Sequence, residues 1–288
     1  MNFKKIIQRL LVFFVGVPVV LCSVIFVPWF NHAFLNVLII IASVIGALEL
    51  REIISHRFIV PSKLFTAILG SIFPLFSSII SIFKLDFLND YFYFVFVIIF
   101  LVISIYEIFF NKDLTFKISI ERILSSFFTI FYPGFFLSFI CKMTEYQFSS
   151  ELISIFLLMV FSSDSIAWLF GMLFGKNNRG FVKVSPNKSI VGFIGAFVGS
   201  ILAGLIGYYF VNFYKYQPNG LRNILIISIV IAFTSIIGDL LESVLKRSGS
   251  TKDSGEIIPG RGGLLDSIDS ILLGAPCFLF LVKILFRI

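Results

Sequence analysis

Long apolar runs recur along the chain at nearly even intervals, with short polar segments between them. A helix needs about 20 mostly apolar residues to cross the hydrocarbon core of a bilayer. The pattern therefore predicts about nine membrane-spanning helices. They cover residues 6–27, 33–50, 64–83, 91–110, 123–141, 151–175, 190–213, 221–242 and 270–287.

One long polar segment, residues 243–269, separates the last two predicted spans. Its basic residues are Lys246, Arg247, Lys252 and Arg261, and its acidic residues are Asp253, Glu256, Asp266 and Asp269. Asp266 and Asp269 stand three residues apart where the last apolar run begins, so both carboxylates lie on one face of a helix. Carboxylate oxygens suit Mg²⁺, which proteins usually hold with one or two carboxylates plus substrate phosphates.

Glycines in the same polar segment favour a phosphate ligand. Gly262 and Gly263 lie just before Asp266, and glycine lets backbone N–H groups approach a phosphate closely. The neighbouring cations can bind the remaining phosphates. Carboxylates, glycines and cations in one segment therefore predict a site for a nucleotide and a metal.

Acidic residues also occur within the apolar runs. Asp164 lies near the middle of the sixth predicted span, where a charge costs several kcal/mol and usually serves a function. The alternative is an ion pair that helps the helices pack. Asp239 and Glu242 end the eighth span and are followed by Lys246, so one helix face is acidic and then basic.

A basic loop follows the sixth span, and a glycine-rich span follows the loop. The loop carries Lys176, Ser185 and Lys188, and taken alone it fits an ordinary positively charged membrane loop. The glycines fit either tight helix packing or the wall of a roomy cavity. Glu49 and Glu107, near the ends of other spans, are interpreted as interfacial charges that extend toward the headgroups.

Composition agrees with a membrane protein. The chain is 58% hydrophobic and 14% charged, whereas soluble domains have roughly 45–50% apolar and about 25% charged residues. The net charge of +7 could indicate nucleic-acid binding, but most of the 23 lysines and arginines fall in alternate loops, as the positive-inside rule requires. We therefore expect no nucleic-acid partner. We expect a multi-pass protein of the inner (cytoplasmic) cell membrane, with its N-terminus and both polar loops in the cytoplasm.

These observations predict an all-α polytopic membrane protein with a polar, cytoplasm-facing active-site cavity. We expect one integrated membrane domain, with residues 1–150 as a transmembrane scaffold of about five helices and 151–288 as the catalytic region. Some helix faces are rich in small residues, which is compatible with a homodimer.

The polar segment resembles the signature of the phosphatidate cytidylyltransferases, also called CDP-diacylglycerol synthases. The matching residues are Ser243, Lys246, Arg247, Lys252, Asp253, Gly255, Pro259, Gly262, Gly263, Asp266 and Asp269. Upstream, the stretches from Asp164 to Ser189 and from Gly238 to Ser243 also resemble the family, so the likeness covers roughly residues 160–275. Arg261 stands where the family usually has histidine, which removes a proton-transfer group but keeps a cation, and Ser267 stands where it usually has arginine.

The resemblance implies that CTP and phosphatidic acid react at the bilayer to give CDP-diacylglycerol and pyrophosphate. It implies Mg²⁺ as cofactor and leaves open a second, monovalent cation. The expected metal ligands are Asp239, Asp266 and Asp269. The expected catalytic residues are Asp164, Asp239, Glu242, Lys246 and Asp253. The expected phosphate-binding residues are Lys176, Ser185, Lys188, Arg247, Lys252, Arg261, Gly262 and Gly263.

Three alternatives remain at this point. A CTP-dependent polyprenol kinase would release CDP instead of pyrophosphate. An ion-coupled transporter could use Asp164 and Asp239 as ion sites, although the sequence shows no inverted repeat. A purely structural membrane protein would leave the charged polar segment unexplained.

Overall fold

The structure, a computed structural model, describes residues 17–110, 116–211, 217–258 and 262–287. In these ranges the regular elements are helices, accompanied by two isolated β-bridges. Eight helices are long and apolar enough to cross a membrane, which confirms an all-α polytopic membrane protein. The first predicted span, 6–27, lies partly outside the described residues, and its described part forms the short helix α2 (Val17–Phe26).

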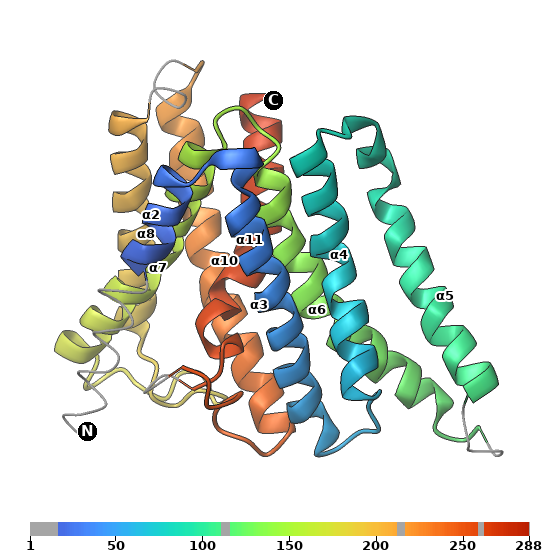
Figure 1. Cartoon of the computed structure of the whole chain (residues 1–288). Coiled ribbons are helices and arrows are strands. Elements are labelled where there is room, and N and C mark those ends of the chain that lie inside the picture. Colours follow the sequence, from blue (N-terminus) through green and yellow to red (C-terminus); the bar gives the residue numbers. More distant parts are fainter. Residues whose placement is uncertain (1–16, 111–115, 212–216, 259–261, 288) are drawn as a thin grey trace. The chain divides into compact units, whose positions relative to one another are not determined.

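The eight long helices correspond to the other eight predicted spans (Figure 1). They are α3 (Trp29–Ser55), α4 (Lys63–Phe83), α5 (Phe92–Phe110, preceded by the 3₁₀ helix η2, Asp86–Tyr91), α6 (Ser119–Met143), α7 (Ser149–Phe174), α8 (Ile190–Phe210), α10 (Gly220–Ser248) and α11 (Leu265–Phe286). The chain forms two compact units. Among the described residues, unit 1 contains 17–28, 146–211, 217–244 and 267–287, and unit 2 contains 29–110, 116–145, 245–258 and 262–266.

Close packing of α7 against α8 organises unit 1. Glycines of α8 occupy the positions where the two helices meet. A Cβ at Gly199 would collide with the backbone of Ser162, and one at Gly207 would collide with the side chain of Ile155. The glycine-rich span is therefore a tight helix contact, which is one of the two interpretations that the sequence left open.

Unit 2 is held together by α3, α4 and α6 around an aromatic core. Phe73 of α4 is fully buried and its ring lies 5.4 Å from that of Phe135 on α6 and 5.9 Å from that of Phe92 on α5. One turn earlier on α4, the carbonyl of Gly70 accepts a 2.6 Å hydrogen bond from the hydroxyl of Ser43 on α3. Figure 1 shows α5 beside α4, with η2 joining them.

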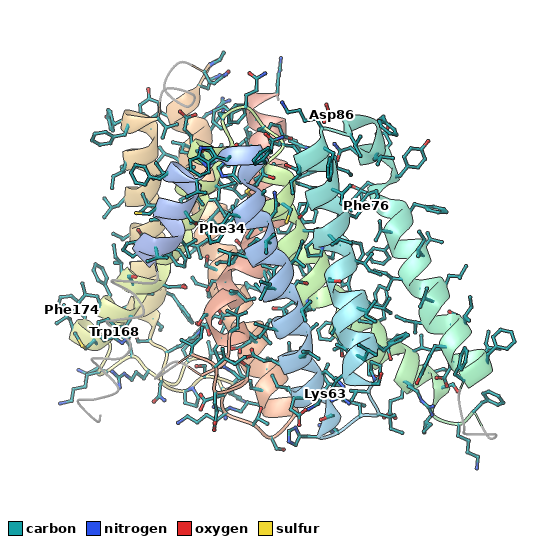
Figure 2. The ribbon with its side chains drawn as sticks, viewed as in Figure 1. Phe34, Lys63, Phe76, Asp86, Trp168 and Phe174 are labelled. Atoms are coloured by element: carbon teal, nitrogen blue, oxygen red, sulfur yellow. The ribbon has the colours of Figure 1, made fainter. Side chains whose placement is uncertain are left out.

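Many large apolar side chains lie on the outside of the helices (Figure 2). Trp168 and Phe174 project from α7, and Phe34 projects from α3, with exposed fractions of 45%, 63% and 51%. In water such surfaces would cause aggregation, whereas lipid tails are as apolar as these side chains. The outer surface therefore agrees with the membrane assignment.

Candidate functional site

Three carboxylates converge in unit 1. Asp239 and Glu242 come from α10, and Asp269 comes from α11. One oxygen from each residue lies within 4.8 Å of the other two, and both Glu242 and Asp269 are buried. We call this group the acidic cluster. Buried carboxylates at such distances repel one another unless a cation or protons offset their charge, so the cluster is suited to hold a metal ion.

A glycine on α10 brings the acidic cluster together. A Cβ at Gly238 would collide with the backbone carbonyl of Asp269, so only glycine allows α10 and α11 to approach so closely here. Asp239 follows this glycine directly, and Glu242 lies one turn further along the same face. The helix contact therefore sets the spacing of the three acids.

The basic loop after α7 supplies a cation to the acidic cluster. Lys188 Nζ lies 2.5 Å from Asp239 Oδ2. The next residue, Ser189, is the N-cap of α8, because its Oγ accepts a 3.0 Å hydrogen bond from the N–H of Gly192. Ser189 also forms an antiparallel bridge with Arg179. The helix cap and the bridge together fix the place of Lys188.

Asp164 joins the same neighbourhood through Ser270. The hydroxyl of Ser270 donates to Asp164 Oδ1 at 3.2 Å, and its backbone N–H donates to Asp269 Oδ1 at 2.6 Å. Asp164, on α7, and Asp269, on α11, are thus linked by one serine. The structure brings together four of the acids and one of the lysines that the sequence singled out.

A second polar group lies in unit 2, where the last turn of α10, the first turn of α11 and the loop between them meet. Asp266 accepts four hydrogen bonds: from Lys246 Nζ at 2.5 Å, from Ser254 N and Oγ at 2.8 Å each, and from Gly263 N at 2.9 Å. Three of these donors contact Oδ2, and only Lys246 contacts Oδ1. A metal-ligand role for Asp266 stays a prediction, and it would require Lys246 to release Oδ1.

In this structure, the backbone groups of the glycines in this loop form hydrogen bonds that stabilise the loop's own conformation. Gly262 has a φ of 118°, which L side chains rarely adopt, and it exchanges two backbone hydrogen bonds with Ile258. The N–H of Gly263 donates to Asp266. Binding of a phosphate by these N–H groups stays a prediction, and it would require these bonds to rearrange.

The remaining predicted residues have no place in either group. Lys176, Arg247, Lys252 and Asp253 are exposed, and Ser185 is partly exposed. Arg261 lies outside the described residues. Exposed cations near the loops can meet an anionic substrate, but the structure gives no contact that assigns them a role.

Glu49 was missed by the sequence reasoning. The prediction of an interfacial charge is wrong: Glu49 on α3 is 7% exposed and accepts hydrogen bonds from Leu264 N, Leu265 N and Ser254 Oγ. Its hydropathy context gave no sign of these partners, because they lie more than 200 residues away along the chain.

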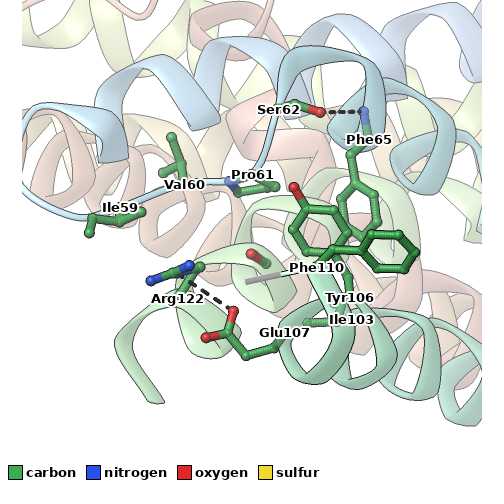
Figure 3. A pocket seen from close by; sticks show the side chains of 11 residues that line it. Ile59, Val60, Pro61, Ser62, Phe65, Ile103, Tyr106, Glu107, Phe110 and Arg122 are labelled. Carbon is green, nitrogen blue, oxygen red and sulfur yellow. Dashed lines mark hydrogen bonds and ion pairs between the residues drawn. The ribbon is translucent and has the colours of Figure 1, made fainter. Parts of the chain in front are cut away.

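The same prediction is wrong for Glu107. This residue is 4% exposed and lies 3.6 Å from the guanidinium of Arg122. Both line a cavity of about 500 Å³, shown in Figure 3. None of the predicted catalytic, metal or phosphate-binding residues lines this cavity, and the predicted polar cavity around the polar segment stays a prediction.

By its fold and these side chains, the chain is a polytopic α-helical membrane protein with an acidic cluster that can hold a metal. Residues 7–285 match the model of the Cytidylyltransferase family, and the chain belongs to this family.

Several curated relatives are named phosphatidate cytidylyltransferase. One from Staphylococcus saprophyticus is 40% identical over 41% of this chain and 44% of its own length. One from Haemophilus influenzae is 41% identical over 42% of each chain, and one from Helicobacter pylori is 41% identical over 50% of this chain and 51% of its own. The chain thus matches about half, or less, of the length of these relatives.

Proposed function

We propose that this protein is a phosphatidate cytidylyltransferase. Membership of the cytidylyltransferase family and the names of the relatives support this proposal. The observation that carries it is the acidic cluster with Lys188 at its edge. Acids and a lysine at the end of membrane helices suit a reaction between a nucleotide and a lipid phosphate.

The acidic cluster suits Mg²⁺ because all three ligands offer hard oxygen atoms. Asp239, Glu242 and Asp269 would hold the ion. When bound, Mg²⁺ would neutralise charge on the nucleotide phosphates. This set differs from the one expected from the sequence in containing Glu242, with Asp266 engaged by Lys246 instead.

In the proposed reaction, a phosphate oxygen of phosphatidic acid attacks the α-phosphorus of CTP. The new P–O bond forms CDP-diacylglycerol, and the bond to the bridging oxygen breaks and releases pyrophosphate. The lipid phosphate is already ionised at neutral pH, so the protein needs to supply no strong base. Its contribution is to position the two phosphates and to offset their charge.

The lysines are the residues that can do this. Lys188 and Lys246 each lie 2.5 Å from a carboxylate, and both can turn from that carboxylate to a phosphate oxygen. Such an exchange replaces one anionic partner by another and leaves the lysine paired throughout. Arg247 and Lys252, which are exposed, would attract the triphosphate.

We propose that the reaction takes place at the membrane surface. The diacyl tails would stay in the bilayer while the headgroup reacts at the cytoplasmic face of the inner membrane. A homodimer is compatible with this arrangement. Orientation follows from the distribution of basic residues.

Product analysis tests the function. Purified protein in detergent, given CTP, phosphatidic acid and Mg²⁺, should release pyrophosphate only when both substrates are present. Release of CDP with a polyprenol acceptor would instead identify a kinase. Ion-coupled uptake into vesicles without CTP would identify a transporter.

A further inference from the structure

We propose that Glu49 is a positioning residue that holds the loop between α10 and α11 in its working conformation. The described residues of this loop are 249–258 and 262–264; Lys246 lies on α10 just before it, and Asp266 lies on α11 just after it. This inference rests on the proposed function for its kinetic consequences, and on the structure alone for the anchoring itself.

Glu49 binds the backbone where α11 begins. Leu264 N donates to Glu49 Oε1 at 2.9 Å, and Leu265 N donates to Oε2 at 2.7 Å. The first N–H groups of a helix have no partner within the helix, and their partial positive charge favours an anion. A carboxylate from α3 therefore fixes the point at which the loop ends and α11 starts.

Ser254 connects Glu49 with the Lys246–Asp266 ion pair. Ser254 Oγ lies 3.2 Å from Glu49 Oε2 and 2.8 Å from Asp266 Oδ2. The hydroxyl has a single proton, so it donates to one carboxylate at a time. Asp266 in turn pairs with Lys246. Contacts thus run from Glu49 through Ser254 and Asp266 to a lysine that would bind phosphate.

Glycines make room for the Glu49 carboxylate. A Cβ at Gly263 would collide with both Glu49 and Ser254, and one at Gly255 would lie 2.8 Å from Glu49 Oε1. At the start of the loop, a Cβ at Gly249 would collide with the carbonyl oxygen of Ile53, also on α3. The same helix therefore contacts the beginning, middle and end of the loop.

The alternative is that Glu49 supports folding in general without acting on the site. The two roles differ in kinetics. A smaller folded fraction lowers the apparent kcat and leaves the KM for CTP unchanged. A displaced loop withdraws Ser254 from Asp266, so the carboxylate that positions the Lys246 side chain is no longer fixed. The KM for CTP then rises as well, because a binding group has lost its position.

The experiment compares Glu49→Gln with Glu52→Gln, the matched control. Glu52 lies one turn further along α3 and is exposed. The glutamine at position 49 keeps one acceptor oxygen and places an NH₂ group against the other N–H donor, so one of the two backbone hydrogen bonds is lost together with the negative charge. We expect the KM for CTP to rise about tenfold or more, the control to match wild type, and Glu49→Asp to give an intermediate value.

Limited trypsin digestion gives a second readout that needs no activity. Lys252 in the loop is exposed, and cleavage there should be several-fold faster in Glu49→Gln than in the control. A wild-type protein without pyrophosphate release would refute the proposed function, and digestion would still decide on the anchor.

Wild-type KM and wild-type cleavage in Glu49→Gln would overturn the inference. If that variant does not fold, Ser254→Ala replaces it, because the serine is in the loop and its loss leaves the α3 side chain in place. Ser254→Ala should raise the KM and the cleavage rate in the same direction, and no change in either would equally overturn the inference.

Discussion

At the scale of single residues, two lysine–aspartate pairs stand out, one in each unit. Lys188 pairs with Asp239 and Lys246 pairs with Asp266. The Lys188–Asp239 pair is partly exposed, with 22% and 40% of the two side chains accessible. Such pairs contribute at most about 1 kcal/mol to stability. We propose that the main contribution of the Lys188–Asp239 pair is to the chemistry of the site.

Lys188→Gln should lower turnover by about tenfold or more while the thermal stability in detergent changes little, because the lysine offsets phosphate charge and adds little to folding. Pyrophosphate release and a melting curve on the same sample measure both effects. Lys183→Gln is the control, since Lys183 is an exposed residue of the same loop. An equal loss in both variants would argue against a specific role for Lys188.

Asp269→Asn should lower turnover by about a hundredfold or more, because it removes one of three carboxylates that would hold Mg²⁺. The Mg²⁺ concentration for half-maximal rate should rise as well. The comparison is Glu151→Gln, which alters an exposed acid at the start of α7. A variant with normal rate and normal Mg²⁺ dependence would exclude Asp269 as a ligand.

At the scale of helices, glycine contacts decide how closely neighbours approach. Gly199 and Gly207 on α8 lie against α7, and Gly238 on α10 lies against α11. The first two shape the packing of unit 1, whereas the third sets the distance between acids. Glycine therefore allows close helix packing in both pairs, and at Gly238 it also sets the spacing of the candidate metal ligands.

Gly199→Ala should destabilise unit 1, because the added methyl group would overlap the backbone of Ser162, and overpacking costs about 1–3 kcal/mol. The fraction of protein that remains monodisperse after heating in detergent measures the loss. Leu202→Ala, on the exposed side of the same helix, should behave like wild type. Equal stability of both variants would contradict the close contact.

Helix ends show what the sequence could and could not predict. The eight long helices were predicted because hydropathy detects apolar runs, but α10 continues past the predicted end at 242 to Ser248. Its last turns are polar, and a hydropathy pattern does not register a helix that leaves the apolar region. At α3 the prediction was close, since positive φ at Phe30, Asn31 and His32 breaks the helix just before residue 33.

Pairing between distant residues was harder to predict. The sequence singled out Asp239, Glu242 and Asp269 as candidate site residues, and the structure brings their carboxylates together; their chemical role stays a prediction. It could not tell which acid would meet a lysine and which would meet other acids. The pairing depends on how closely α10 and α11 pack, which no local sequence pattern encodes. The partners of Glu49 lie more than 200 residues away along the chain, so they depend on the tertiary fold.

At the scale of the whole molecule, the distribution of basic residues predicts one orientation in the membrane. Within unit 2, Lys63 and Asp86 mark opposite ends of α4 (Figure 2). If α4 spans the bilayer, loops at its two ends face different compartments. The proposed reaction requires the polar loop between α10 and α11 to face the nucleotide-rich side.

Single cysteines placed at exposed positions test this orientation. In a background without the native cysteines, His56→Cys and Glu256→Cys should react with a membrane-impermeant maleimide only in inverted vesicles. Asp90→Cys should react in intact cells, because it follows the other end of α4; all three positions are exposed. Labelling of Glu256→Cys from outside would reverse the proposed topology.

Glu49 accepts hydrogen bonds from main-chain N–H groups. These contacts depend on the backbone conformation of the loop and not on most of its side chains. Loops of different sequence could therefore be exchanged among members of the family and still dock on α3. Such a chimaera would need to keep only four residues: an acid at position 49, a serine at 254, and glycines at 255 and 263, where any Cβ would crowd the carboxylate. Substrate preference could then be altered in the loop without redesigning the membrane helices that hold it.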